Sequence, residues 1–275
     1  MRLSFSTLGC PSYSIDAVLN LARKEGYEGV ALRTLRNQVM LPELSEFSPE
    51  GIGETAKKFR EAKIAVSCVM SGVHFNATDR EEWRYQLQVA KTYLEIAQAL
   101  EAPSIRVFGG SLTPDTDPQK ILPRVVEGLR QTSEWGEKKG VYVLLETHDS
   151  FSTGKQVRKL LESVSHSYLG VVWDFLHSLR FGETPEETWN LLGPWVKDVH
   201  IKDSAAYSAE SFDLKLPGKG NLPIPKILSL LNNQSYRQWL TFEWEKAWHP
   251  EIEEPEVAIP YFASYIKQQL RELEL

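Results

Sequence analysis

Residues 141–177 hold two runs of one pattern, Val141-Tyr-Val-Leu-Leu-Glu146-Thr-His148 and Val171-Val-Trp-Asp174-Phe-Leu-His177. Each run begins with β-branched and large apolar residues, which is typical of a buried β-strand, and each ends in ionisable side chains. Between the runs, apolar residues recur at helical spacing: Val157, Leu160, Leu161 and Val164. The stretch therefore predicts a strand–helix–strand unit with polar side chains where each strand ends.

The same alternation extends along the whole chain. Short apolar runs separated by helical segments predict eight strands: Leu3–Thr7, Gly29–Arg33, Ile64–Met70, Ile105–Phe108, Val141–Thr147, Val171–Phe175, Val196–Ile201 and Trp239–Glu245. Strict alternation of strands and helices implies parallel strands joined by right-handed crossovers. Eight such units in 275 residues match an α/β fold, the (β/α)₈ TIM barrel. No linker-like change of composition divides the chain, so we expect residues 1–275 to form a single domain.

An open, doubly wound sheet is the alternative fold. That fold normally carries a glycine-rich phosphate-binding turn directly after its first strand. Here the first predicted strand is followed by Leu8-Gly9-Cys10-Pro11-Ser12, which is not such a turn. The sequence therefore favours the closed barrel.

The composition argues against several classes of protein. Hydrophobic residues make up 42% and charged residues 25% of the chain, which is an ordinary globular mixture and not that of a disordered or fibrous protein. The net charge of −6 repels phosphates, so we expect neither a nucleic-acid nor an anionic-membrane partner. No apolar run approaches the roughly 20 residues that cross a bilayer. The first ten residues do not resemble a signal peptide, and Cys10 and Cys68 make no disulfide framework, so we expect a cytoplasmic protein.

Ionisable residues occur near the ends of the last four predicted strands. They are Glu146, Asp174, His200 and Glu243. Side chains alternate faces along a strand, and the apolar neighbours of these residues suit the side that faces the helices. All four are therefore expected to point into the barrel at its carboxyl-terminal end, where TIM barrels carry their chemistry.

Three carboxylates inside a barrel would repel one another, and one imidazole cannot neutralise them. A divalent cation resolves this conflict, and carboxylate and imidazole ligands without thiolate suit Mn²⁺, Mg²⁺ or Co²⁺, with Zn²⁺ also possible. The alternative is a set of buried salt bridges with Lys197, Lys202 or Arg106. Arg106 could face the site, but we favour its pairing with an acid in the lower layer of the barrel.

The residues at the strand ends carry a resemblance to the xylose isomerase-like TIM-barrel superfamily of sugar phosphate isomerases and epimerases, which includes ketose epimerases, hydroxypyruvate isomerases and inosose dehydratases. The resemblance covers essentially the whole chain and is most specific in these segments: Glu146, Asp174-Phe-Leu-His177, Val199-His200-Ile-Lys202-Asp203, Leu216-Pro-Gly218-Lys-Gly220-Asn-Leu222 and Phe242-Glu243-Trp-Glu245. The resemblance implies that the two glutamates act as acid and base, that His177 contacts substrate, and that one divalent metal is bound by Glu146, Asp174, His200 and Glu243.

The chemistry that fits these residues is proton abstraction next to a carbonyl in a small carbohydrate, which is a sugar, a sugar phosphate or a keto-polyol, through a metal-stabilised enediolate. Glu146 and Glu243 could reach opposite faces of the substrate, so that one removes the α-proton and the other returns it. This would make the protein an isomerase or epimerase. Three further residues are expected to bind substrate. His177 lies just beyond the sixth strand, His148 has the same inward parity as Glu146, and Lys202 has that of His200.

Two departures from the family pattern concern substrate specificity. Many relatives have Glu in the second strand, where this chain has Ala31, and ketohexose epimerases place an Arg several residues beyond the seventh-strand His, where Ser204–Ser211 offers none. An inosose-dehydratase-like lyase on the same metal site is therefore the main alternative. An apurinic-endonuclease-like hydrolase would need a histidine where the fourth strand ends in Phe108-Gly109, and a non-catalytic barrel would be expected to lose the metal ligands.

The last helical segment leaves the oligomeric state open. Its apolar residues are Tyr261, Phe262, Tyr265 and Ile266. They could close the barrel or form the contact of a homo-oligomer.

Overall fold

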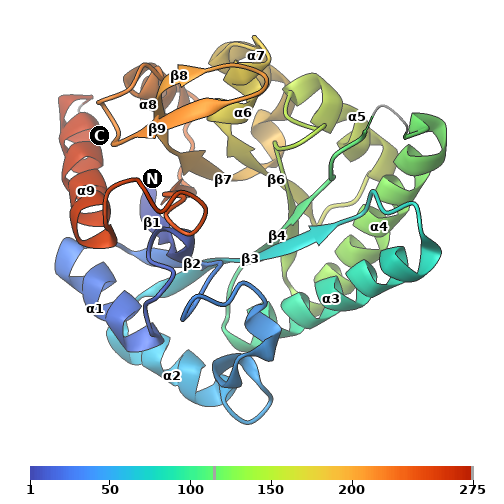
Figure 1. Cartoon of the computed structure of the whole chain (residues 1–275), viewed down its shortest axis with the longest axis horizontal. Helices are drawn as coiled ribbons and strands as arrows, with labels where there is room; N and C mark the ends of the chain where they lie inside the picture. The colour runs from blue at the N-terminus through green and yellow to red at the C-terminus, as the bar shows by residue number, and fades with distance from the viewer. Residues whose placement is uncertain (114–115, 274–275) are drawn as a thin grey trace.

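A closed barrel of eight parallel strands, surrounded by helices, forms the centre of the computed structural model, which describes residues 1–113 and 116–273 (Figure 1). Around the barrel the order is β1-β10-β7-β6-β5-β4-β3-β2. The barrel strands are β1 (Arg2–Ser6), β2 (Gly29–Leu32), β3 (Ala65–His74), β4 (Ser104–Phe108), β5 (Tyr142–Glu146), β6 (Leu169–Asp174), β7 (Val196–Ile201) and β10 (Trp239–Phe242). The predicted (β/α)₈ TIM barrel is confirmed, and each predicted strand is present with ends shifted by a few residues at most.

The helices lie between these strands and pack on the outside of the barrel (Figure 1). They are α1 (Ile15–Glu25), α2 (Ile52–Ala62), α3 (Arg80–Ala99), α4 (Pro118–Lys139), α5 (Gly154–Val164), α6 (Phe175–Arg180), α7 (Pro185–Leu192), α8 (Ile224–Asn233) and α9 (Pro255–Glu272). Local signals set their ends. At α7 the Thr184 hydroxyl accepts the Glu187 amide while the Glu187 carboxylate accepts the Thr184 amide, and Pro185 occupies the first helical position.

Alternation along the strands decides which side chains enter the barrel. On β6, Trp173 packs outward against Trp189 of α7, with ring centroids 5.9 Å apart. The next residue, Asp174, must then face inward. Asp174 is in register with His200 on β7, so their side chains enter the barrel at the same level.

A short antiparallel hairpin, β8 (Asp203–Tyr207) and β9 (Phe212–Lys215), follows β7 and was not predicted from the sequence. The buried Asp203 carboxylate fixes the chain around it by accepting four backbone amides, from Ser204 at 2.8 Å, Gly218 at 2.7 Å, Gly220 at 3.0 Å and Leu222 at 3.0 Å. The Gly218–Gly220 turn is thereby held beside the start of the hairpin. Glycine is required at 220, because an added Cβ would lie 2.2 Å from the Asp203 carboxylate.

The last helix packs on the outside of the barrel against β10. Phe262 and Ile266 of α9 are fully buried, and the Phe262 ring stacks on Phe242 of β10 at 4.4 Å between centroids. These contacts account for the apolar residues at 262 and 266 through packing within the chain. In the part of the chain that the structure describes, no helix is long and apolar enough to cross a membrane.

Candidate metal centre

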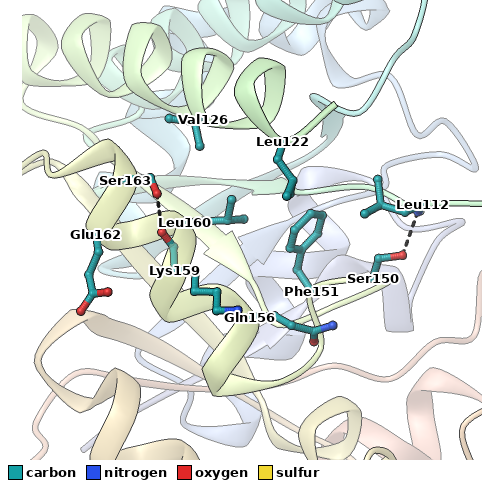
Figure 2. A pocket seen from close by; sticks show the side chains of 10 residues that line it. All are labelled: Leu112, Leu122, Val126, Ser150, Phe151, Gln156, Lys159, Leu160, Glu162 and Ser163. Atoms are coloured by element: carbon teal, nitrogen blue, oxygen red, sulfur yellow. Dashed lines mark hydrogen bonds between the residues drawn. The ribbon is translucent and has the colours of Figure 1, made fainter. Parts of the chain in front are cut away.

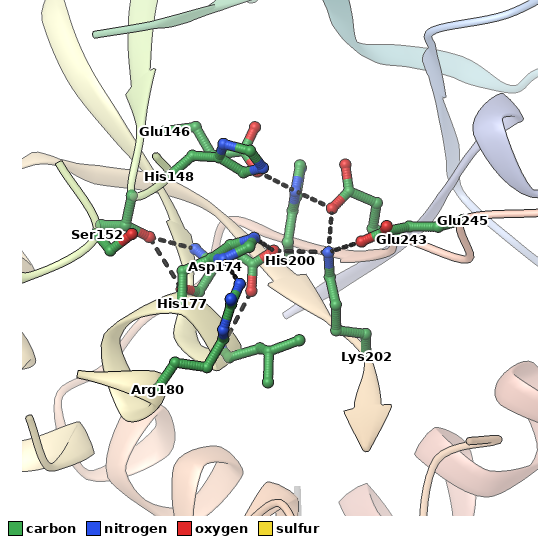
Figure 3. Close-up of polar contacts among 12 residues, drawn as sticks. Glu146, His148, Ser152, Asp174, His177, Arg180, His200, Lys202, Glu243 and Glu245 are labelled. Atoms are coloured by element: carbon green, nitrogen blue, oxygen red, sulfur yellow. Dashed lines mark hydrogen bonds and ion pairs between the residues drawn. The ribbon is translucent and has the colours of Figure 1, made fainter. Parts of the chain in front are cut away.

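Four ionisable side chains from four strands meet inside the barrel. Glu146 ends β5, Asp174 ends β6, His200 lies in β7, and Glu243 directly follows β10. Each is at most 5% exposed, and each offers a ligand atom within 4.8 Å of the other three (Figure 3). The structure therefore brings together the four residues that the sequence placed at the strand ends, and we call them the ligand quartet.

The ligand quartet suits a divalent cation. His200 Nδ1 lies 3.5 Å from Glu146 Oε1 and 3.3 Å from Glu243 Oε2. Both ring nitrogens of His200, with Glu146 Oε2, are buried without a hydrogen-bond partner among the described residues. Buried polar atoms of this kind are costly unless they are satisfied. A cation that accepts carboxylate oxygens and an imidazole nitrogen would satisfy them, and the donor set suits Mn²⁺, Mg²⁺, Co²⁺ or Zn²⁺.

Lys202 supplies a positive charge to the same carboxylates. Its ammonium nitrogen lies 2.8 Å from Asp174 Oδ2, 2.7 Å from Glu243 Oε2 and 2.5 Å from Glu245 Oε1 (Figure 3). Burial nevertheless raises the pKa of Asp174 to about 6, against the opposing effect of Lys202. Glu245 was not predicted as a site residue, although it shares the parity of Glu243 two residues earlier, and that alternation could have identified it.

The favoured expectation for Arg106 was wrong. The buried guanidinium faces the ligand quartet, with Nη1 lying 3.2 Å from Glu146 Oε2, and its carbon lies 4.0 Å from the centre of the Phe108 ring. The register explains the error, because Arg106 is paired with Leu144, one layer below Glu146 on the same inward side of β5. The long side chain then reaches up to the ligand quartet, which strand parity alone does not reveal.

Neighbouring charges keep both glutamates of the quartet ionised. Burial alone would raise the pKa of each. Arg106 holds the pKa of Glu146 below its ordinary value, and His200 and Lys202 hold the pKa of Glu243 well below it. Both carboxylates are therefore available as bases at neutral pH.

The two other histidines predicted at the site lie together beside the ligand quartet. The rings of His148 and His177 meet edge to face at 4.3 Å, and His177 Nε2 lies 3.5 Å from Asp174 Oδ2. Burial holds the pKa of His177 well below its ordinary value, so this ring is neutral. Burial also acts to lower the pKa of His148, but the Asp149 carboxylate, 3.0 Å away, outweighs it and the pKa is raised.

A separate hollow of about 640 Å³ lies on the outside of the barrel between α4 and α5 (Figure 2). Its lining is largely apolar, with Leu112, Leu122, Val126 and Phe151 over part of it. It contains none of the residues of the ligand quartet, although Leu112, Ser150 and Phe151 come from the loops that follow β4 and β5.

Comparison with known proteins gives relatives of two activities. The chain is 22% identical over 253 residues to fructoselysine 3-epimerase of Escherichia coli O157:H7, covering 88% of this chain and 90% of the relative. It is 23% identical over 192 residues to 3-dehydroshikimate dehydratase of Bacillus anthracis, covering 69% of this chain and 66%, just under two thirds, of that relative. The relatives are therefore enzymes, both epimerases and dehydratases.

A solved structure agrees with the fold. The structure of the IOLI protein with a binding zinc atom superimposes with a TM-score of 0.78 at 20% identity, covering all of this chain and 96% of that one. The model of the family described as xylose isomerase-like TIM barrel matches residues 19–264. This match spans most of the chain, and the chain therefore belongs to the xylose isomerase-like TIM barrel family.

Proposed function

We propose that this protein is a divalent-metal-dependent isomerase or epimerase of a small carbohydrate, working by proton transfer at the carbon next to a carbonyl. One observation carries the proposal: Glu146, Asp174, His200 and Glu243 present ligand atoms within 4.8 Å of one another in a buried interior. Relatives with epimerase activity support the same class of reaction.

Glu146, Asp174, His200 and Glu243 would hold the metal ion. When bound, a divalent ion supplies Lewis acidity to the substrate's carbonyl oxygen and stabilises the negative charge that develops there. Mn²⁺, Mg²⁺ and Co²⁺ are favoured because three of the four ligands are carboxylates, and Zn²⁺ also suits the set. A zinc-containing neighbour of the same fold is consistent with that range of ions.

Glu146 and Glu243 would move the proton. They come from β5 and from the end of β10, with β6 and β7 between them around the barrel, so they approach a central substrate from different sides. Both are ionised at neutral pH, as a base must be. One glutamate takes the proton from the α-carbon, and the other, after taking up a proton from solvent, delivers it to the same or the neighbouring carbon.

His177, His148 and Lys202 would position the substrate. The neutral His177 ring can donate one hydrogen bond and accept another, which suits a sugar hydroxyl. Lys202 carries a positive charge beside Asp174, because its pKa is raised well above its ordinary value, and the pKa of His148, whose ring contacts His177, is also raised. A ketone or hydroxyl oxygen between these groups would be held against the two glutamates.

Deuterium exchange tests this proposal. The protein, loaded with Mn²⁺, would be incubated with ketohexoses, ketopentoses, keto-inositols and oxo acids of the same carbon number in D₂O, and deuterium at the α-carbon would be followed by NMR. The proposal predicts incorporation for at least one of these compounds, lost on EDTA treatment and restored by Mn²⁺. Absence of exchange with every compound at full metal loading would refute it.

A dehydratase is the second candidate, and His148 favours it. Asp149, 3.0 Å away, raises the pKa of His148, which favours the protonated ring that would donate to a departing hydroxyl. The Bacillus anthracis relative is also a dehydratase. In this reaction a glutamate removes the α-proton, the C–O bond to the β-carbon breaks, and His148 protonates the leaving oxygen as water. A new enone absorbance without return of deuterium to the α-carbon would identify this outcome.

A further inference from the structure

Arg106 lies beside the ligand quartet, and the proposed reaction gives no role to its buried guanidinium. Its side chain is 2% exposed, and Nε and Nη1 have no hydrogen-bond acceptor among the described residues. Its one ion-pair neighbour, Glu146 Oε2 at 3.2 Å, belongs to the quartet and lies outside hydrogen-bond geometry. A guanidinium carries five donors in a planar fork, so burying it with two donor nitrogens unmatched is costly unless a ligand accepts from them.

Arg33 provides a second positive charge on the same side of the barrel. It directly follows β2, and one of its nitrogens donates to the carbonyl of Val39 at 3.1 Å. Burial, together with the nearby Arg106, lowers the pKa of Arg33 to about 10, against the opposing effects of Tyr93, Glu243 and Glu146. Two guanidiniums that repel each other within reach of the quartet are expected where an anion is bound.

A count of the charged groups gives the charge that the anion must carry. Four carboxylates face three cationic side chains: Glu146, Asp174, Glu243 and Glu245 against Lys202, Arg106 and Arg33. Without a metal ion the net charge of this set is −1, and a divalent cation would change it to +1. His148 and Asp149 form a separate pair, 3.0 Å apart, and stay outside the count. Arg180 lies at the more exposed edge, where it donates to the carbonyls of Ser208 and Ala209, and it stays outside this count of the buried groups. One extra negative charge on the substrate brings the buried group of residues to neutrality.

We propose that the substrate of this enzyme carries a carboxylate, which Arg106 and Arg33 bind on the β2–β4 side of the barrel while the reacting carbons face Glu146 and Glu243. The inference rests on the proposed function and names its substrate class, an oxo or hydroxy acid. A planar carboxylate matches the guanidinium fork with two parallel hydrogen bonds. A phosphate monoester brings up to two negative charges at neutral pH and would leave the site negative.

Calorimetry with matched ligands tests the assignment. The Mn²⁺-loaded full chain would be titrated with aldonates of four to six carbons, with the alditols of the same configuration, and with the corresponding alditol monophosphates. At least one aldonate should bind ten to a hundredfold more tightly than its alditol, the range of charge-assisted hydrogen bonds. Arg33→Gln should remove this preference, Arg33→Lys should retain part of it, and Arg60→Gln, which removes an exposed charge on α2, should leave it intact.

Each result has one meaning. Alditols that bind as tightly as aldonates, monophosphates that bind more tightly than aldonates, or a carboxylate preference that survives in both Arg33→Gln and Arg106→Gln would overturn the inference. A preference that comes from the metal alone would survive in both arginine variants and would therefore also overturn the inference. Deuterium exchange with neutral sugars alone would support the proposed function and reject a carboxylate on the substrate. Arginine-dependent aldonate binding, without exchange or water loss for any acid, would support the carboxylate site and reject the proposed function.

Discussion

Lys202 Nζ lies 2.8 Å from Asp174 Oδ2, and both side chains are almost completely buried. The same ammonium contacts Glu243, so one cation serves two members of the ligand quartet and Glu245 beside them. A buried carboxylate without a counter-charge is strongly unfavourable. Lys202 would therefore share with a divalent cation, bound as proposed, the compensation of the negative charge on these carboxylates.

Replacing Lys202 tests whether its ammonium group compensates the buried carboxylates. Lys202→Met should lower the free energy of unfolding in EDTA by about 3–5 kcal/mol, because the carboxylates lose a buried partner. Saturating Mn²⁺ should raise the stability of this variant more than that of the parent protein. Urea unfolding with and without Mn²⁺ measures both. Lys215→Met, which removes an exposed lysine of β9, should change stability by about 0.5 kcal/mol or less. Equal stability of Lys202→Met and the parent in EDTA would contradict the assignment.

Removing the proton-transferring carboxylate should separate binding from chemistry. Glu243→Gln keeps the size of the side chain and one ligand oxygen but loses the basic group, so the rate of deuterium exchange should fall by about 10²–10⁴-fold. Metal content, measured by elemental analysis after loading, reports whether the ion is retained. Glu251→Gln changes an exposed glutamate of the following loop and should leave the exchange rate as it is. An unchanged rate in Glu243→Gln at full metal content would show that this carboxylate moves no proton.

Asp203 should control the loop over the site. Asp203→Ala leaves four backbone amides without their acceptor, so the free energy of unfolding should fall by at least about 2 kcal/mol. Amide hydrogen exchange around Gly218 and Gly220 should accelerate more than exchange in the barrel strands. Asp213→Ala on the neighbouring strand removes an exposed carboxylate and serves as the control. Loss of protection spread evenly over the barrel would argue against a local anchoring role.

Asp198 gives stability a dependence on pH. Burial raises its pKa to about 6 in the folded protein, above the ordinary 3.8. The folded state thus holds a proton that the unfolded state releases, and the contribution of this group to stability falls as pH rises from about 4 to 6. Above that range the ionised carboxylate costs about 3 kcal/mol. Asp198→Asn should therefore be more stable than the parent at about pH 8, with little difference near pH 4. Urea unfolding of the two EDTA-treated proteins at both pH values measures this stability difference. A difference that is the same at pH 4 and pH 8 would contradict the prediction.

The sequence predicted the fold because the barrel repeats a strong local signal. Apolar runs such as those ending at Glu146 and Asp174 alternate with amphipathic helices, and parity along a strand is a local property. The convergence of the ligand quartet follows from that parity and from the position of each residue near a strand end. These features need no knowledge of side-chain conformation.

The rest of the site depends on how long side chains reach across strands. Arg106 starts one layer below Glu146 and extends up to it, and the expectation of a partner in the lower layer missed this. Arg33 lies just beyond β2, where the backbone leaves the regular pleat. The β8–β9 hairpin is stabilised by one buried carboxylate, Asp203, and a short polar segment carries little hydrophobic periodicity to predict it.

The central claim is that Glu146, Asp174, His200 and Glu243 hold one divalent cation, and anomalous diffraction from crystals soaked in Mn²⁺ tests it most directly. The account predicts a single strong anomalous peak inside the barrel, coordinated by oxygens of the three carboxylates and by one nitrogen of His200. A barrel interior without a peak, or a peak bound by other residues while these four side chains point away from one another, would contradict it.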